Sequence, residues 1–227
     1  MKPSIFALRL LALGLFSIPL AQAAEEVRPF SKNGKPEGWL VRSWANVGEL
    51  PENASEWLVK DGVLHGSDPR GTWLVCEKEY GDFVLEFEWK LGPRGNGGVG
   101  LRFPLWGDPA FAGLEVQMVD PRYYGDYQAK PTELTGAIYP VLAPRAQVYR
   151  PEEWNSYQIT CQGTRVKVVL NGELLHDVDL AIQTQPLERG VPLSQRPQRG
   201  HIGFQELSRG GGQVLIRNLR LRELEAK

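Results

Sequence analysis

Short runs of alternating apolar and polar residues fill most of the chain after residue 55, and clusters of Gly, Pro, Asn and Asp separate them. An alternation of period two is typical of a strand with one buried face. The pattern predicts strands over residues 56–62, 63–67, 72–77, 83–90, 98–104, 114–120, 154–163, 165–172, 201–207 and 214–224. Because these strands are short, numerous and without a repeating unit, they indicate an all-β fold, a jelly-roll β-sandwich in a single domain.

Turns and loops divide these strands clearly. Asn171-Gly172 is a strong signal for a two-residue hairpin that leads into ELLHDVDL, and Lys60-Asp61-Gly62 marks a second turn. The segments 121–153 and 183–200 are rich in Pro, Tyr, Gln and Arg and are long for the loops of a compact domain. Because long loops often carry function, we expect these two to contribute to a site.

One strand, within GLEVQMVD at residues 113–120, places Glu115 and Gln117 on one face and apolar residues on the other. We expect the strands at 83–90, 98–104 and 114–120 to be antiparallel neighbours with a shared polar face, because sequential strands usually pair. That polar face is either a solvated outer surface or the floor of a sugar site. The same parity places Glu86, Glu88 and Arg102 on this polar face. In the strand at 201–207 it places His201 and Gln205 on the polar side.

The N-terminus predicts export. Lys2 and Arg9 precede the apolar run LLALGLFSIPLAQA, which ends in Ala21-Gln22-Ala23. This pattern indicates a secretory signal peptide over residues 1–23, a mature domain over residues 24–227 and a periplasmic or secreted location. The mature chain has 24 basic and 27 acidic side chains, a net charge of −3. Such a charge gives no reason to expect nucleic acid or a membrane as a partner, and the oligomeric state stays open.

Other chemical signals are weak. The run GNGGVG at residues 95–100 matches G-x-G-x-x-G, but no helix is expected after it, so a dinucleotide site is not indicated. The histidines show no metal-ligand spacing, and no G-x-S-x-G motif of a serine hydrolase occurs. Cys76 and Cys161 form either one disulfide in an oxidising compartment or two separate buried thiols.

The order of several motifs resembles one family. These motifs are WLVKDGVL, LVCEKEYGDFVLEFEW, RGNGGVGLR, LEVQMVD, GAIYP, WNSYQITCQGTRVKVVLNGE and GHIGFQE with VLIRNLRLREL. Together, over residues 28–224, they are similar to the 3-keto-disaccharide hydrolases, also described as 3-keto-glucoside 1,2-lyases and 3-keto-2-hydroxyglucal hydratases. The resemblance implies a concanavalin A-like sandwich that acts on an oxidised glycoside. Two departures stand out: Gly97 replaces a serine, and Glu206-Leu207-Ser208 lacks a histidine that members often carry.

A 3-keto sugar requires a base for its acidic C2 proton, a cation for the oxyanion and a donor for the leaving oxygen. With the resemblance, these needs suggest Glu115 as the base, Arg102 as the oxyanion partner and Tyr139 as the proton donor. Asp120 with Glu115 is a candidate ligand pair for a divalent metal, the one cofactor considered. The candidate sugar-binding residues are Asn96, Gln117, Gln205, Trp106, Tyr124 and His201.

Two further functions remain open from the residues alone. The first is a laminarinase-like glycosidase, which needs two carboxylates at a set separation. Gln117 is an amide, so the second carboxylate would have to be Asp120, brought to the Glu115 face by a bulge. The second is a carbohydrate-binding module that keeps the sandwich without the chemistry, which the missing serine and histidine would fit.

Overall fold

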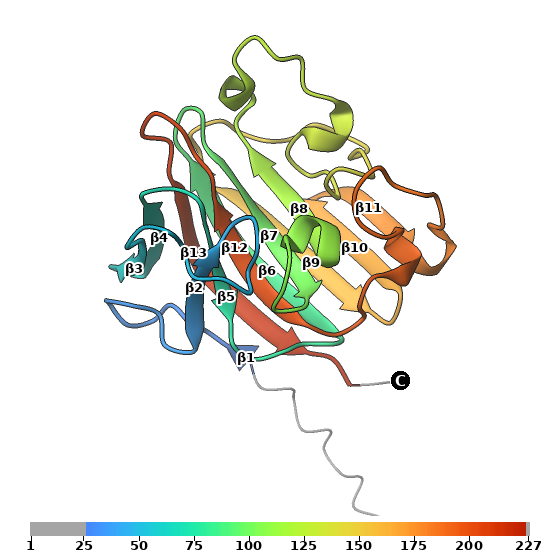
Figure 1. Ribbon diagram of the computed structural model, residues 1–227, viewed down its shortest axis with the longest axis horizontal. Helices are drawn as coiled ribbons and strands as arrows, with labels where there is room; N and C mark the ends of the chain where they lie inside the picture. The colour runs from blue at the N-terminus through green and yellow to red at the C-terminus, as the bar shows by residue number, and fades with distance from the viewer. Residues whose placement is uncertain (1–25, 226–227) are drawn as a thin grey trace, which may run out of the picture.

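The computed structural model describes residues 26–225 as two antiparallel sheets (Figure 1). Sheet A contains, in spatial order, β11 (Glu173–Asp179), β10 (Arg165–Leu170), β9 (Asn155–Gln162), β6 (Phe83–Leu91), β13 (Val214–Glu223), β4 (Val63–Asp68) and β3 (Glu56–Lys60), and β1 (Glu26–Val27) also pairs with β13. Sheet B contains β2 (Trp39–Ser43), β5 (Thr72–Cys76), β12 (His201–Glu206), β7 (Asn96–Phe103) and β8 (Leu114–Val119). The predicted all-β sandwich is therefore confirmed.

Short helices lie in the connections. They are α1 (Pro109–Ala112) and the 3₁₀ turns η1 (Pro121–Tyr124), η2 (Pro131–Glu133), η3 (Leu180–Ile182) and η4 (Leu193–Gln195). Asp108 begins α1, because its carboxylate accepts a hydrogen bond from the Ala110 N–H and Pro109 fits the first helical turn. The predicted hairpin is also confirmed, since Asn171 and Gly172 connect β10 to β11 with φ of 52° and 85°.

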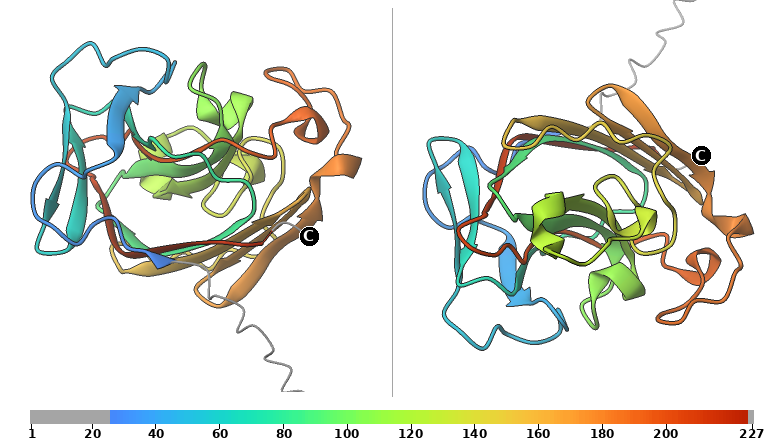
Figure 2. Two further views of the ribbon diagram at one scale, coloured as in Figure 1. Left: turned by 90° about the horizontal axis from the view of Figure 1, so that it is seen from below. Right: turned by 90° about the horizontal axis from the view of Figure 1, so that it is seen from above.

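The pairing predicted for β6, β7 and β8 is partly wrong. β7 pairs with β8, but β6 belongs to sheet A, between β9 and β13. The chain crosses from one layer to the other between β6 and β7, and the two layers stack as curved sheets in Figure 2. Glu86 and Glu88 therefore lie on the outer face of sheet A, where Glu88 accepts a hydrogen bond from Arg217, far from Glu115.

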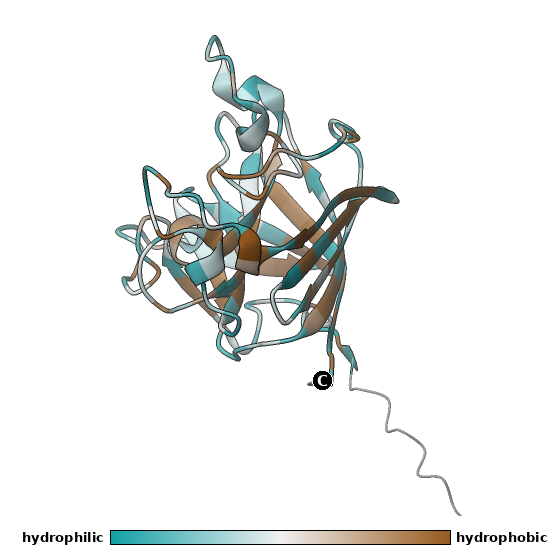
Figure 3. Cartoon of the chain, turned by 90° about the vertical axis from the view of Figure 1, so that its right-hand side faces the viewer, coloured by the Kyte–Doolittle hydropathy of each residue, from teal (hydrophilic) through white to brown (hydrophobic). Residues whose placement is uncertain are grey.

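The apolar faces of both sheets meet in one core, seen as brown inward strands in Figure 3. Phe87 and Phe204, from opposite sheets, pack edge to face with ring centroids 5.2 Å apart. The Tyr157 hydroxyl of sheet A donates a 2.8 Å hydrogen bond to the Gln117 carbonyl of sheet B. Burial of each large apolar side chain contributes roughly 1.5–3 kcal/mol to folding. This core fixes which face of β8 points outward.

Arg102 does not lie beside Glu115, so its predicted placement is wrong. Between Gly100 and Phe103, two residues of β7 oppose one of β12, and Arg102 adopts a left-handed φ of 53°. This bulge turns Phe103 onto the outer face of sheet B and buries Arg102 completely. The Arg102 guanidinium donates to the carbonyls of Gly81 and Gly163, both at 2.7 Å, and pairs with Asp82 at 3.0 Å.

Replacement of Arg102 with lysine is therefore expected to affect the fold. A lysine keeps the charge but cannot bind three partners in that geometry, so the free energy of unfolding should fall by about 2–3 kcal/mol. Urea denaturation measures this change, with the exposed Arg222→Lys as the matched control. Equal stability of the two variants would show that the Arg102 contacts contribute nothing.

The remaining predictions about compartment have separate outcomes. Cys76 and Cys161 are two separate buried thiols, which is the second of the two alternatives. The predicted signal peptide lies outside the described residues. Within residues 26–225, no helix is both long and apolar enough to span a membrane.

Candidate functional site

The outer face of sheet B gathers most of the predicted site residues. On this face Glu115 lies opposite Gly100, and Gln117 and Gln205 lie on either side of Gly98. A Cβ atom at Gly98 would come within 1.9 Å of Glu115 Oε1, so the carboxylate folds across the backbone of Gly98. Glycine is needed here because any larger residue would occupy the space that the carboxylate fills.

Glu115 lies in an unusual environment for a carboxylate. It is only 2 % exposed, and its Oε1 atom is buried without a hydrogen-bond partner. Burial raises the pKa of Glu115 well above its usual value, and the negative charge of Asp108 raises it further. A raised pKa is typical of a carboxyl group that exchanges a proton near neutral pH. Glu115 Oε1 is therefore shielded from solvent in this structure.

Two loop side chains, Asp108 and Tyr139, lie near Glu115, and Phe111 and Arg189 pack against them. Tyr139 donates its backbone N–H to the Glu115 carbonyl at 2.9 Å, and burial together with Glu115 raises the pKa of its phenol to about 12. The Tyr139 ring packs against Phe111 of α1, with centroids 6.3 Å apart. Arg189 lies over the same Phe111 ring at 3.9 Å, and its Nη2 is 3.6 Å from Asp108 Oδ2. The site therefore has two carboxyl groups, a phenol and a guanidinium.

Three amide side chains extend the face along sheet B. Asn96 is 7 % exposed, and its Oδ1 atom is buried without a partner, like Glu115 Oε1. The Gln117 Oε1 accepts a hydrogen bond from the Met118 N–H at 3.0 Å, whereas Gln205 lies between Gly98 and Trp73 in the strand register. Unpartnered buried acceptors are rare, and hydroxyl groups of a bound sugar would supply the missing donors.

The other predicted binding residues are more scattered. Tyr124 lies near Tyr139 and Glu115. Burial is the main cause of the raised pKa of its phenol, the charge of Glu133 comes next, and Tyr139 and Glu115 add smaller contributions. Trp106, in the connection between β7 and α1, is 64 % exposed. His201 is on the same face of β12 as Gln205 but at the opposite end, where its Nδ1 bonds the Cys76 carbonyl at 2.8 Å.

Asp120 does not pair with Glu115, so the predicted metal ligand set is wrong. Arg122 binds both oxygens of the Asp120 carboxylate at 2.8 Å and lowers its pKa although burial opposes this change. The Tyr149 hydroxyl lies 3.4 Å from the same carboxylate. The described residues also contain no group of three or more His, Cys, Asp or Glu side chains that could hold a metal ion. The residues present therefore do not fit the metal that was considered.

Sequence reasoning missed three charged residues of this face. Asp108 had a usable signal, since Asp-Pro before a short apolar run is typical of a helix start. Arg189 had no such signal, because the long loop 183–200 has no periodicity. Arg42 of β2 lies beside Trp73 in the register and has a buried, unpartnered Nε atom, yet the strand itself was not predicted.

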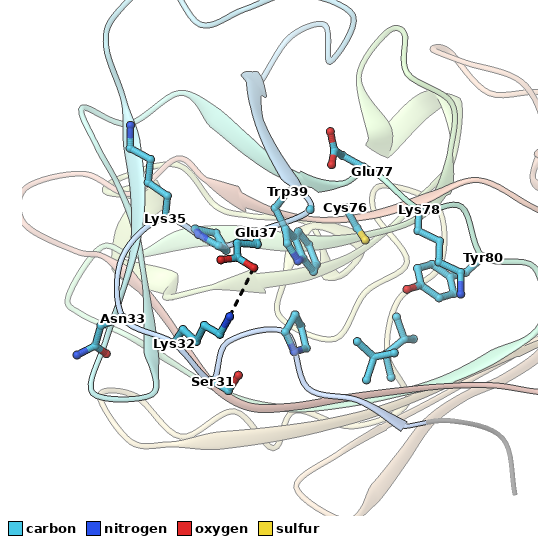
Figure 4. Close-up of a pocket in the computed structure, with 15 residues that line it drawn as sticks. Ser31, Lys32, Asn33, Lys35, Glu37, Trp39, Cys76, Glu77, Lys78 and Tyr80 are labelled. Carbon is cyan, nitrogen blue, oxygen red and sulfur yellow. Dashed lines mark ion pairs between the residues drawn. The ribbon is translucent and has the colours of Figure 1, made fainter.

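A hollow of about 550 Å³ lies elsewhere, between residues 27–39 and residues 76–80 (Figure 4). Trp39 and Tyr80 line it, but none of the predicted site residues do. Its lysines already have acidic partners, as in the Lys32–Glu37 pair at 3.8 Å that Figure 4 marks. We therefore assign the candidate site to the outer face of sheet B.

Comparison with known proteins gives a family match over nearly all of the described chain. The model of the 3-keto-alpha-glucoside-1,2-lyase-like domain matches residues 31–222. The chain belongs to this family. A 3-keto-alpha-glucoside-1,2-lyase-like domain is a sandwich of a carbohydrate-active family, and the fold described above fits that assignment.

Solved structures are similar to this lyase-like domain as well. A candidate glycosyl hydrolase from Parabacteroides distasonis is 25% identical, with a TM-score of 0.66, and the match covers 82% of this chain and 100% of that one. The carbohydrate-binding module CBM66 from Bacillus subtilis is 16% identical, with a TM-score of 0.51 over 86% of this chain and 100% of the module, which shows the fold alone. No curated protein matches the chain significantly.

The two departures from the family pattern lie at different places in this lyase-like domain. A side chain at position 97 would point away from Glu115, because its Cβ would lie 2.5 Å from the Gln205 carbonyl oxygen and 2.7 Å from Val214 of the core. The serine missing there therefore removes no group beside Glu115. Leu207 does lie beside the site, since its N–H donates to the Asn96 carbonyl at 2.8 Å.

Proposed function

We propose that the protein is an exported enzyme that cleaves 3-keto-glycosides by removing the C2 proton and eliminating the group on C1. The observation that carries the proposal is the Glu115 carboxylate, which is buried, has an unpartnered Oε1 and lies across Gly98. Its raised pKa makes it a stronger proton acceptor than an ordinary carboxylate. The carbon next to a ketone is acidic enough for such a base.

In the proposed reaction Glu115 takes the C2 proton, and the electron pair forms an enolate with the ketone oxygen. The C1–O bond then breaks, a C1=C2 double bond forms, and Tyr139 gives its phenolic proton to the departing oxygen. The Tyr139 pKa of about 12 keeps the phenol protonated at neutral pH until that step. Solvent carries the proton from Glu115 back to Tyr139, and addition of water across the double bond completes hydrolysis.

In this proposal Arg189, rather than Arg102, is the cation that stabilises the oxyanion. All three Arg102 contacts are made to Gly81, Gly163 and Asp82, so its charge cannot stabilise an enolate beside Glu115. The Arg189 guanidinium lies next to Asp108 and lowers the pKa of Tyr139 by its charge, although burial dominates that pKa. Asp108, held by the Ala110 N–H, orients Arg189 toward the site.

Incubation of the mature protein with a 3-keto-glucoside and with the parent glucoside, with and without EDTA, tests this function. We expect release of the aglycone from the keto form alone. Cleavage of the parent would favour the laminarinase-like alternative, with Asp108 rather than Asp120 as the second carboxylate. A loss of turnover with EDTA would require metal ligands other than the Glu115–Asp120 pair.

One observation also favours the binding module as a second candidate. The unpartnered acceptors of Asn96 and Glu115 would bind sugar hydroxyls whether or not a reaction follows. Calorimetric binding of the 3-keto-glucoside without release of its aglycone would support this function and contradict the enzymatic one.

A further inference from the structure

Three arginines gather at the end of the site face that is farthest from Glu115. The Arg209 guanidinium lies 4.4 Å from the centre of the Tyr123 ring, and Arg70 Nη2 lies 3.4 Å from the Tyr123 hydroxyl. Arg94 lies beside Arg209. The Arg209 backbone N–H donates to the Arg94 carbonyl, and Arg94 Nη1 lies 3.6 Å from where a Cβ of Gly210 would be. Tyr123 thus contacts two positive charges, and the third lies beside the turn that follows Arg209.

These charges form no ion pair in the part of the chain that the structure describes. Within residues 26–225, no carboxylate lies within 4.0 Å of the Arg70, Arg94 or Arg209 guanidinium. Asp68 and Glu206 line the same region. The Glu206 carboxylate accepts the N–H groups of Ser208 and Val214, and burial raises its pKa while these hydrogen bonds and the charge of Arg70 lower it, so Glu206 compensates Arg70 only in part. Like charges held together repel each other, so a bound anion would stabilise the cluster.

The cluster also has room for a ligand. Arg70 and Arg209 line a hollow of about 530 Å³ together with the turn Gly210-Gly211-Gly212. This volume falls in the range of small-molecule sites, roughly 300–1,000 Å³. Guanidinium groups bind carboxylate and sulfate oxygens in pairs, which makes an arginine cluster selective for such groups.

Tyr123 connects this hollow to the proposed active site. Its ring packs edge-on against Tyr124, with centroids 5.5 Å apart, and Tyr124 in turn lies near Tyr139 and Glu115. On β8, Glu115 is four residues from the end of the strand at Val119, which corresponds to about 13 Å. One sugar ring at Glu115 would therefore place the next ring close to the arginines.

We propose that Arg70, Arg94 and Arg209 bind an anionic group, a carboxylate or sulfate, on the leaving sugar of the substrate. The inference rests on the proposed function, since it names the class of glycoside that the same site prefers. The substrate would be a 3-keto-disaccharide whose second ring is acidic, such as a uronic acid. Tyr123 holds two of the guanidiniums in position for that ring.

Calorimetry with the Glu115→Gln protein tests this proposal without turnover. The probes are two 3-keto-disaccharides that differ only in their leaving sugar, which is glucuronic acid in one and glucose in the other. We expect the acidic disaccharide to bind about 10-fold more tightly at low salt, with a smaller preference at high salt. The Arg70→Gln/Arg209→Gln double variant should lose this preference and keep its affinity for the neutral disaccharide, whereas Arg222→Gln, an exposed arginine on sheet A, should change neither.

Three results would overturn the inference. The first is equal affinity for the two disaccharides. The second is an equal loss of affinity for both disaccharides in the double variant, which would mean that the arginines only hold the loop. The third is binding of inorganic sulfate without any preference for the acidic disaccharide. Turnover of the neutral 3-keto-disaccharide by the native protein tests the proposed function separately, so failure of one is distinguishable from failure of the other.

Discussion

Replacement of Glu115 with glutamine is expected to lower the turnover of a 3-keto-glucoside by about 10²–10⁴-fold, the range that a positioned general base contributes. Glutamine has nearly the same shape, so it preserves the packing against Gly98 while it removes the proton acceptor. A discontinuous assay of released aglycone, read across substrate concentrations, separates kcat from KM. The loss should appear in kcat, because the base acts in the transition state rather than in ground-state binding.

The same substitution should change how stability depends on pH. Burial raises the pKa of Glu115 in the folded protein above its unfolded value, near 4.5, so the folded state holds this proton more tightly. Its contribution to the free energy of unfolding is complete below the unfolded pKa and declines as the pH rises through the folded pKa. Glu115→Gln removes this decline, so at mildly alkaline pH the variant should melt at a higher temperature than the native protein. Glu206, with a folded pKa of about 7, is unchanged in this variant, so part of the dependence of stability on pH remains.

Glu173→Gln is the matched control for both measurements. Glu173 is exposed on β11, so its neutralisation should change neither turnover nor the dependence of melting on pH. A Glu115→Gln protein with native turnover would remove the proposed base. An unchanged pH dependence of melting would mean instead that the carboxylate finds a partner in solution.

The strands were predictable because each depends on local sequence. From Glu56 to Glu223, the alternation of period two and the Asn171-Gly172 turn placed every strand. β2 lies before this range and was missed, because its residues are all only partly buried and show no clear contrast. The same rule failed at Arg102, because a bulge with a left-handed residue breaks the alternation without leaving a pattern in the sequence. It also failed to separate β6 from β7, since nothing local determines which layer a strand enters.

Strand parity made the candidate site predictable only where strands build it, whereas Tyr139 and Tyr124 were suggested by the resemblance and by their place in loops next to the Glu115 strand. Glu115, Gln117 and Gln205 share a face because strand parity and a regular register determine their orientation. Asp108 and Arg189 join them through loops whose paths depend on contacts far away in the chain, such as the Arg189 guanidinium on Phe111. Tertiary contacts of that kind carry no periodic signal, so a single sequence does not reveal them.

Replacement of Gly98 with alanine is expected to reduce turnover by about 100-fold or more, because a 1 Å displacement of a reacting group costs on this order. The added Cβ would lie 1.9 Å from Glu115 Oε1 and 2.7 Å from its Cδ, far inside van der Waals contact. The Glu115 side chain must therefore leave its position or the two strands must separate. Turnover of the 3-keto-glucoside and the free energy of unfolding, measured on the same preparation, distinguish these two responses.

A double-mutant cycle with Glu115→Ala makes this prediction specific. If the clash is with the Glu115 side chain, Gly98→Ala should destabilise the native protein and have little effect once position 115 is alanine. Gly81→Ala is the control, because its Cβ would meet no atom closer than 3.7 Å and should leave both turnover and stability unchanged. Additive effects of Gly98→Ala and Glu115→Ala would show that the carboxylate does not lie across this glycine. The space at Gly98 and the charge at Glu115 would then be independent features of sheet B, and the base would need another means of positioning.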